Sequence, residues 1–76
     1  MEKEFRRARL YDYIERFTIA RGYPPSLAEM AAEIGYSDTI VRQDLAVMKE
    51  RGCIDWFAGK ARSIRITGPY RLPAKA

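Results

Sequence analysis

Two short amphipathic segments follow one another with only a tight turn between them. The first starts at residues 26–29, SLAE, which have the spacing of a capping box, and Gly35 suits the position that ends a helix. The second can be capped by Ser37 or Asp38 and ends before Gly52. Their apolar stripes consist of Leu27, Met30, Ala31 and Ile34 in the first segment and Val41, Leu45 and Met48 in the second.

The flanking sequence adds a helix before this pair and a β-hairpin after it. Apolar residues at helical spacing predict a helix from about residue 4 to 20, and residues 22–25, GYPP, form a rigid connector. Residues 53–57 and 63–67 alternate like two short strands, with a loop at 58–62 between them.

This element order predicts the fold class: mainly α with a small antiparallel β-hairpin, in a winged helix-turn-helix of three helices plus a two-stranded wing. We expect this domain to span residues 1–68 and residues 69–76 to form a basic, proline-containing tail. Cys53 and Trp56 are expected to pack in the core or against the hairpin.

Composition excludes several functional classes. With 76 residues the chain holds one domain, and its single cysteine and lack of histidine argue against a zinc site, a disulfide and the commonest general base. No apolar run is long enough to span a membrane, and the single cysteine fits a reducing cytoplasm. We therefore expect a cytoplasmic protein that is not an enzyme and needs no cofactor, metal, membrane or small-molecule substrate.

The positive charge is concentrated near the end of the sequence. Residues 1–55 contain nine basic and ten acidic side chains, whereas residues 56–76 contain five basic and no acidic ones. A local field of one sign indicates a polyanionic partner, of which double-stranded DNA is the commonest for such a fold, although a solvated basic tail would have the same composition.

The second helix of a helix-turn-helix enters the major groove of DNA. With its apolar stripe placed on the core, the residues left to face DNA are Thr39, Ile40, Arg42, Gln43 and Ala46. Gln can pair with adenine, Arg with guanine or phosphate, and Thr or Ile can contact a thymine methyl. An ordinary amphipathic surface helix would show the same pattern.

The candidate contacts to the DNA backbone come from the turns and the wing. They are Ser26, Ser37, Lys60, Arg62 and Arg65. Capping alone would also explain Ser26, and a solvated turn would explain the basic residues of the wing.

Several of these segments resemble a known family. Residues 22–31, GYPPSLAEMA, are similar to the G-x-P-P-[ST]-x-x-E-[IM]-A motif of the N-terminal DNA-binding domain of LexA-type repressors, and residues 35–37, 45–54 and 59–65 match further segments of that domain. The resemblance covers about residues 6–67. It implies a winged helix that binds duplex DNA specifically, usually at an inverted repeat, and represses transcription in the bacterial SOS response.

Two departures from the family limit what carries over. Residues 35–45 look one residue shorter, and 41–45, VRQDL, are closer to the V-R-R-D-L of DeoR-type repressors, so the operator does not carry over. The dimerising, self-cleaving domain of LexA is absent, so a complete chain would not cleave itself. Homodimers would then need the tail with Tyr70 and Leu72 or cooperative pairing on DNA, or a separate protein partner would take their place. A bacterial or phage origin fits either case.

A second function remains open at this point. The same fold can serve as a protein-interaction module that docks on polymerase, a replication protein or another repressor. Acidic residues on the recognition helix would favour that function. Asp38 and Asp44 are offset by Arg42 and Lys49, so charge does not decide between the two.

Overall fold

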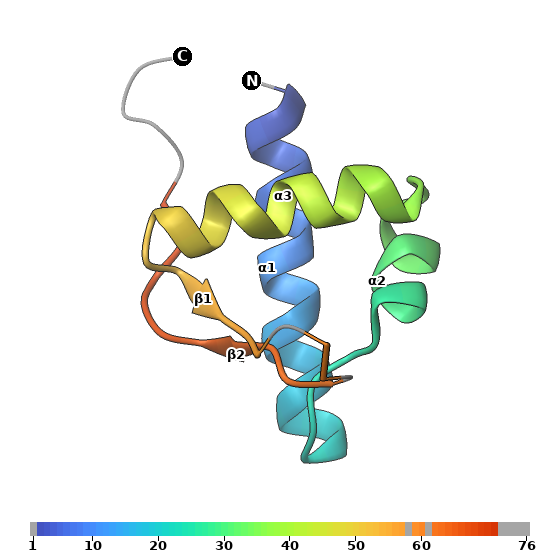
Figure 1. Cartoon of the computed structure of the whole chain (residues 1–76), viewed down its shortest axis with the longest axis vertical. Helices are drawn as coiled ribbons and strands as arrows, with labels where there is room; N and C mark the ends of the chain where they lie inside the picture. The colour runs from blue at the N-terminus through green and yellow to red at the C-terminus, as the bar shows by residue number, and fades with distance from the viewer. Residues whose placement is uncertain (1, 58, 61, 72–76) are drawn as a thin grey trace.

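Three helices and a two-stranded sheet make up the computed structural model, which describes residues 2–57, 59–60 and 62–71. The first helix, α1 (Glu2–Arg21), places Leu10, Ile14 and Phe17 on its buried face. Helix α3 crosses in front of α1, and α2 lies beside the crossing (Figure 1). None of the helices in the described part of the chain combines the length and apolarity needed to cross a membrane.

The second helix, α2 (Leu27–Ile34), begins and ends as its sequence predicts. The Ser26 hydroxyl accepts a hydrogen bond from the Glu29 amide at 3.2 Å, and the Glu29 carboxylate accepts one from the Ser26 amide at 2.8 Å. Gly35 ends the helix at φ 75°, a left-handed conformation that glycine adopts without a steric penalty. The predicted capping box and C-terminal glycine are therefore confirmed.

The third helix, α3 (Asp38–Glu50), takes Ser37 as its N-cap. The Ser37 hydroxyl accepts a hydrogen bond from the Ile40 amide at 3.3 Å, which decides between the two residues that could have capped it. The Cys53 amide donates to the Met48 carbonyl at 2.9 Å where the chain leaves the helix. The turn between α2 and α3 is thus limited to residues 35–37.

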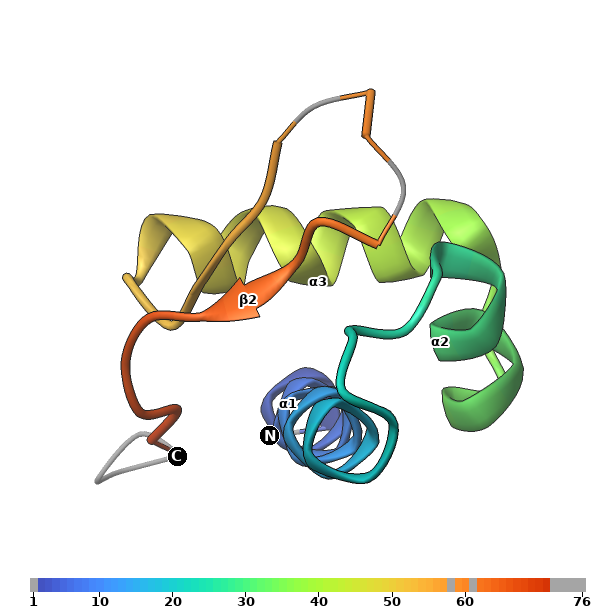
Figure 2. The same cartoon turned by 90° about the horizontal axis from the view of Figure 1, so that it is seen from below.

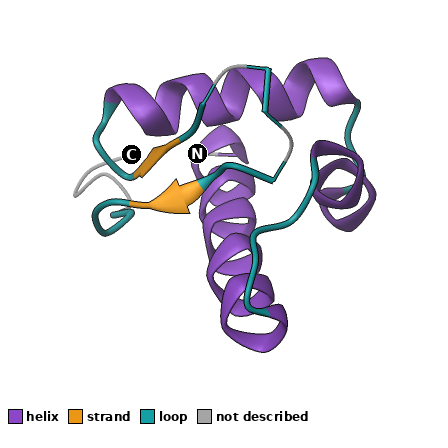
Figure 3. Ribbon diagram, turned by 60° about the horizontal axis from the view of Figure 1, so that its bottom comes forward, coloured by secondary structure: helices purple, strands orange, loops and turns teal. Residues whose placement is uncertain are grey.

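The hairpin is shorter than the sequence predicts. Strands β1 (Ile54–Asp55) and β2 (Arg65–Ile66) pair antiparallel, with Ile54 opposite Ile66 (Figure 3). Beyond them, the Ser63 hydroxyl accepts from the Phe57 amide at 3.0 Å and donates to the Phe57 carbonyl at 3.1 Å. A side chain thereby takes the backbone groups that a longer ladder would have used. Within the predicted loop, Ala58 and Ala61 lie outside the described residues.

One hydrophobic core joins all five elements. Its buried members are Leu10, Ile14, Met30, Ile34, Val41, Leu45, Met48, Cys53 and Ile54. Trp56 is half-buried and packs against this cluster, so the predicted packing roles of Cys53 and Trp56 are confirmed. The core fixes the angle at which α3 lies across α1, and with it the direction of the outer face of α3.

A carboxylate lies at the centre of the contact between α1 and α3. Asp44 is fully buried and accepts hydrogen bonds from Arg6 Nε and Nη2 at 2.5 and 2.6 Å and from Arg7 Nε at 3.0 Å. This carboxylate raises the pKa of the Arg6 guanidinium. The sequence interpretation of Asp44 as a surface acid on the recognition helix is wrong. Two arginines of α1, distant from Asp44 in the sequence, neutralise it in the interior.

The residues after β2 return to α1. Tyr11 donates a hydrogen bond to the Gly68 carbonyl at 2.9 Å, and the rings of Tyr11 and Tyr70 lie 6.0 Å apart. The Tyr70 hydroxyl donates to the Glu4 carboxylate, which also accepts from Arg51 at 2.7 and 2.8 Å. Tyr70 is thus engaged within its own chain, while Leu72 lies outside the described residues. The domain boundary at residue 68 stays a prediction.

The Glu4 carboxylate makes the stability of the fold sensitive to acid. Its pKa is lowered from 4.5 to about 2, first because Arg51 donates hydrogen bonds to it and then because Tyr70 does. Burial, followed by this contact with Glu4, raises the pKa of Tyr70 to about 12. In the unfolded chain Glu4 binds a proton more readily, so its contribution to stability is complete above pH 4.5 and is lost as the pH falls toward 2.

We expect the urea midpoint of the wild-type chain to fall more steeply between pH 4.5 and pH 2 than that of Glu4→Gln. Comparing the two profiles cancels the other carboxyl groups that titrate in this range. Parallel profiles would show that the contact with Arg51 contributes nothing to stability.

Candidate nucleic-acid interface

The outer face of α3 carries the residues predicted to face DNA. Thr39, Arg42, Gln43 and Ala46 are exposed and Ile40 is half-buried. The opposite face is buried, as predicted for Val41, Leu45 and Met48. Helix α3 crosses in front of α1 in Figure 1, and no helix in the described part of the chain lies on the side of α3 opposite α1.

The wing lies on the same side of the molecule as this outer face. Seen end-on to α1, the chain between β1 and β2 extends beyond α3 on the side opposite α1 (Figure 2). Lys60 is exposed there, and its amide donates to the Phe57 carbonyl at 3.1 Å. The structure therefore brings the outer face of α3 and the exposed lysine of the wing onto one side.

Arg65 lies on β2 and not in the turn of the wing. It is exposed and lies opposite Asp55 in the sheet, so part of its positive field is offset. The Trp56 amide and then Lys49 lower the pKa of the Asp55 carboxyl, which keeps it charged. Lys49 Nζ lies 3.5 Å from Asp55 Oδ1 and 4.6 Å from the centre of the Trp56 ring.

Arg62 is directed toward α2. It donates to Glu29 Oε1 at 2.8 Å and to the Pro24 carbonyl at 3.1 Å, and its guanidinium lies 4.9 Å from the centre of the Tyr23 ring. The sequence predicts Glu29 only as half of a capping box, and this second partner was not predicted. No local pattern relates residues 29 and 62, which is why the pair became visible only in the fold.

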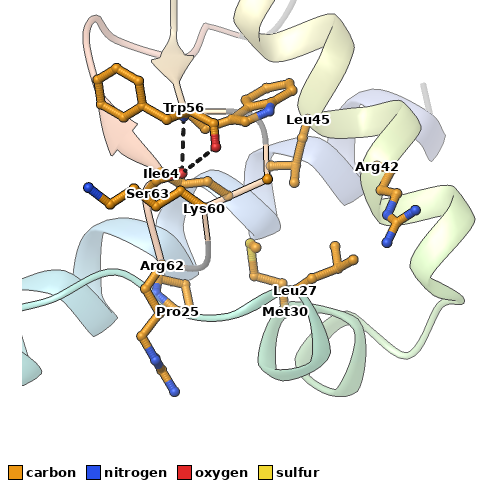
Figure 4. Close-up of a pocket in the computed structure, with 12 residues that line it drawn as sticks. Pro25, Leu27, Met30, Arg42, Leu45, Trp56, Lys60, Arg62, Ser63 and Ile64 are labelled. Carbon is orange, nitrogen blue, oxygen red and sulfur yellow. Dashed lines mark hydrogen bonds between the residues drawn. The ribbon is translucent and has the colours of Figure 1, made fainter.

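A pocket of about 550 Å³ separates the wing from α2 and α3 (Figure 4). Arg42 on α3 and Arg62 on the wing stand on opposite sides of it. Apolar side chains also line it, namely Leu27, Met30, Leu45, Trp56, Phe57 and Ile64. Phe57 is 61% exposed. Two consecutive aromatic residues, Trp56 and Phe57, in a predicted strand place one apolar side chain on each face, and this signal could have indicated an apolar surface here.

The two serines of the site serve as helix caps. The Ser26 amide is bonded to Glu29, and the hydroxyl groups of Ser26 and Ser37 accept from amides of the following turns. Their predicted contacts with phosphate would add to these capping bonds. Across the described residues, no three Cys, Asp or Glu side chains gather in a way that could hold a metal ion.

Comparison with known proteins identifies relatives over most of the chain. It is 35% identical over 69 residues to the LexA repressor of Burkholderia vietnamiensis, which covers 90% of this chain and 32% of that protein. It is 36% identical over 72 residues to the LexA repressor of Burkholderia mallei, covering 88% of this chain and 34% of that protein. The chain thus spans about a third of the length of these curated relatives.

The sequence model of one family, the LexA DNA-binding domain, matches residues 4–63. The matched region contains most of α1, all of α2, α3 and β1, and the wing as far as Ser63. The match extends over most of the 76 residues, and the repressors named above agree with it. The chain belongs to the LexA DNA-binding domain family.

Proposed function

We propose that this protein is a sequence-specific, double-stranded DNA-binding transcriptional repressor of the bacterial cytoplasm. The observation that carries the proposal is that the wing extends beyond α3 on the side opposite α1 and carries Lys60, which is exposed. Membership of the LexA DNA-binding domain family supports it, as do relatives that are named repressors.

In this proposal the N-terminal half of α3 lies in the major groove. Gln43 pairs with adenine, and Arg42 pairs with guanine or with a phosphate. Thr39 and Ile40 contact thymine methyl groups, and the small Ala46 allows the helix to approach the bases closely. Four of these side chains are exposed and Ile40 is half-buried, which supports the assignment.

Phosphate contacts would fix the register of the domain on the duplex. We assign these contacts to Lys60 and Arg65 of the wing and to Ser26 and Ser37 at the helix N-termini. Lys60 is the stronger candidate of the two basic residues, because Asp55 offsets part of the charge of Arg65. Arg62 is held by Glu29 of α2, so we assign it no phosphate contact.

We further propose that two copies of this chain bind together on an inverted repeat, as the resemblance to LexA-type repressors implies. The chain matches only about a third of their length, so pairing is part of the proposal. The rival function, docking on another protein through α3, loses one of the two acidic residues that would favour it, because the buried Asp44 contributes no negative charge to the outer face.

Selection from a randomised duplex library at physiological salt tests the proposal. Sequencing of the bound fraction should show an enriched motif, and two half-sites at fixed spacing would show that two copies bind together. Recovery of unenriched sequence would contradict specific binding and leave only a general attraction of the basic residues for phosphate.

A further inference from the structure

A single carboxylate joins the wing to the first turn of α2. Glu29 Oε1 accepts from Arg62 Nη1 at 2.8 Å and from the Ser26 amide at 2.8 Å. Arg62 Nη1 also donates to the Pro24 carbonyl at 3.1 Å, and its guanidinium lies over the Tyr23 ring. The helix cap and the wing contact thus share one oxygen atom.

The backbone at Arg62 is unusual as well. Its φ of 53° lies in the left-handed region, where within the described residues only glycines otherwise occur. Side chains with a Cβ rarely adopt this conformation unless their surroundings determine it. The three contacts of the Arg62 side chain provide such a determinant.

The pair is too exposed to serve mainly for stability. The side chains of Arg62 and Glu29 are 40% and 35% exposed, and exposed ion pairs contribute little to folding. A negative charge beside a DNA-binding surface also weakens the attraction for phosphate. The capping box already gives Glu29 a role within α2, and its contact with Arg62 adds a second role that can offset this disadvantage.

We propose that Glu29 and Arg62 form a pin that positions the wing for DNA, with Arg62 remaining on α2 in the complex and Lys60 making the phosphate contact. This inference rests on the proposed function. It makes Glu29 a positioning residue, and it replaces direct phosphate binding by Arg62, the role predicted from sequence.

The variant Glu29→Gln distinguishes an Arg62 that positions the wing from an Arg62 that binds phosphate, because the two roles predict different changes in duplex affinity. Glutamine retains the capping box but removes the charge that holds Arg62. If Arg62 is a pin, duplex affinity should fall about fivefold, as expected for the loss of one exposed charged contact. If Arg62 binds phosphate directly, losing the nearby carboxylate should leave affinity unchanged or raise it, which would overturn the pin.

Glu33→Gln is the matched control on the same helix. Glu33 is exposed, and its backbone carbonyl, rather than its carboxylate, accepts a hydrogen bond from Arg9 at 3.3 Å. Removing this charge should leave affinity unchanged or slightly raise it. A fall equal to that of Glu29→Gln would show a general charge effect and overturn the pin.

The salt dependence of binding gives a second readout. Arg62→Lys keeps the positive charge but loses the planar group that lies over Tyr23. The pin predicts that both Arg62→Lys and Arg62→Ala weaken binding, Arg62→Ala the more, and that both leave the slope of log K against log salt unchanged. A direct phosphate contact predicts that Arg62→Ala reduces that slope by about one and that Arg62→Lys preserves it.

The contact between Arg62 and α2 can also be measured without DNA, so that failure of the pin is distinguishable from failure of the proposed function. Nuclear Overhauser effects between the Tyr23 ring and the Arg62 side chain should be present in the wild-type chain and lost in Glu29→Gln. Their persistence in the variant would overturn the pin even if no duplex bound. Failure of the wild-type chain to bind any duplex would instead overturn the proposed function.

Discussion

Replacing Asp44 with alanine is expected to lower the free energy of unfolding by about 3 to 5 kcal/mol, the usual effect of removing one partner of a buried ion pair. The side chains of Arg6 and Arg7 are only 10% and 12% exposed, so little water can replace the lost carboxylate; Arg6 would lose its carboxylate partner, while Arg7 would keep Glu4 at 3.1 Å. The loss is a large fraction of the stability of a small domain. Urea unfolding followed by circular dichroism at neutral pH measures it.

Asp12→Ala provides the control for this experiment. Asp12 also pairs with an arginine, Arg16 at 3.0 Å, but the two side chains are 54% and 79% exposed. Its replacement should change stability by no more than about 0.5 kcal/mol. Equal effects of the two variants would show that water reaches Arg6 and Arg7 once the carboxylate is gone, and the account of Asp44 would be wrong.

The second large effect concerns the outer face of α3. Arg42→Ala and Gln43→Ala are each expected to weaken binding to the selected duplex by about 1 to 3 kcal/mol, roughly thirtyfold in affinity at the middle of that range. Both side chains are exposed, so their removal should leave the fold intact. Fluorescence anisotropy titrations at a fixed salt concentration measure the loss.

Base preference distinguishes a lost base contact from a lost charge. Repeating the selection with Gln43→Ala should relax the preference at one base position of each half-site, whereas loss of a phosphate contact weakens all sequences alike. Arg16→Ala, which removes an exposed arginine from α1, should leave both affinity and preference nearly unchanged. If it weakened binding as much as Arg42→Ala, binding would depend on net charge rather than on α3.

Local signals in the sequence were sufficient to predict the helices. The capping box at residues 26–29 and Gly35 act within a few residues of one another, so their spacing alone defines the limits of α2. The apolar stripe of α3 follows in the same way from helical periodicity, and it also determines which residues face outward. The outer face of α3 was predictable because it is the complement of a periodic core.

Contacts between distant residues were not predictable in this way. Asp44 is 38 residues from Arg6, and Glu29 is 33 residues from Arg62. A charged residue on an amphipathic helix normally indicates the solvent side, so a buried carboxylate neutralised from another helix contradicts the local pattern. The early end of the hairpin has a similar cause, because the hydroxyl of Ser63 replaces backbone pairing.

The most direct test of the central proposal is to map the bound duplex on the chain by amide chemical shifts. With uniformly ¹⁵N-labelled protein and the selected duplex, the largest changes should fall on residues 39–46 of α3 and on Lys60 of the wing. The amides near Asp12 and Arg16, which are exposed on α1, should change little. Changes centred on α1, or spread evenly over the basic residues without a centre on α3, would contradict the proposed interface.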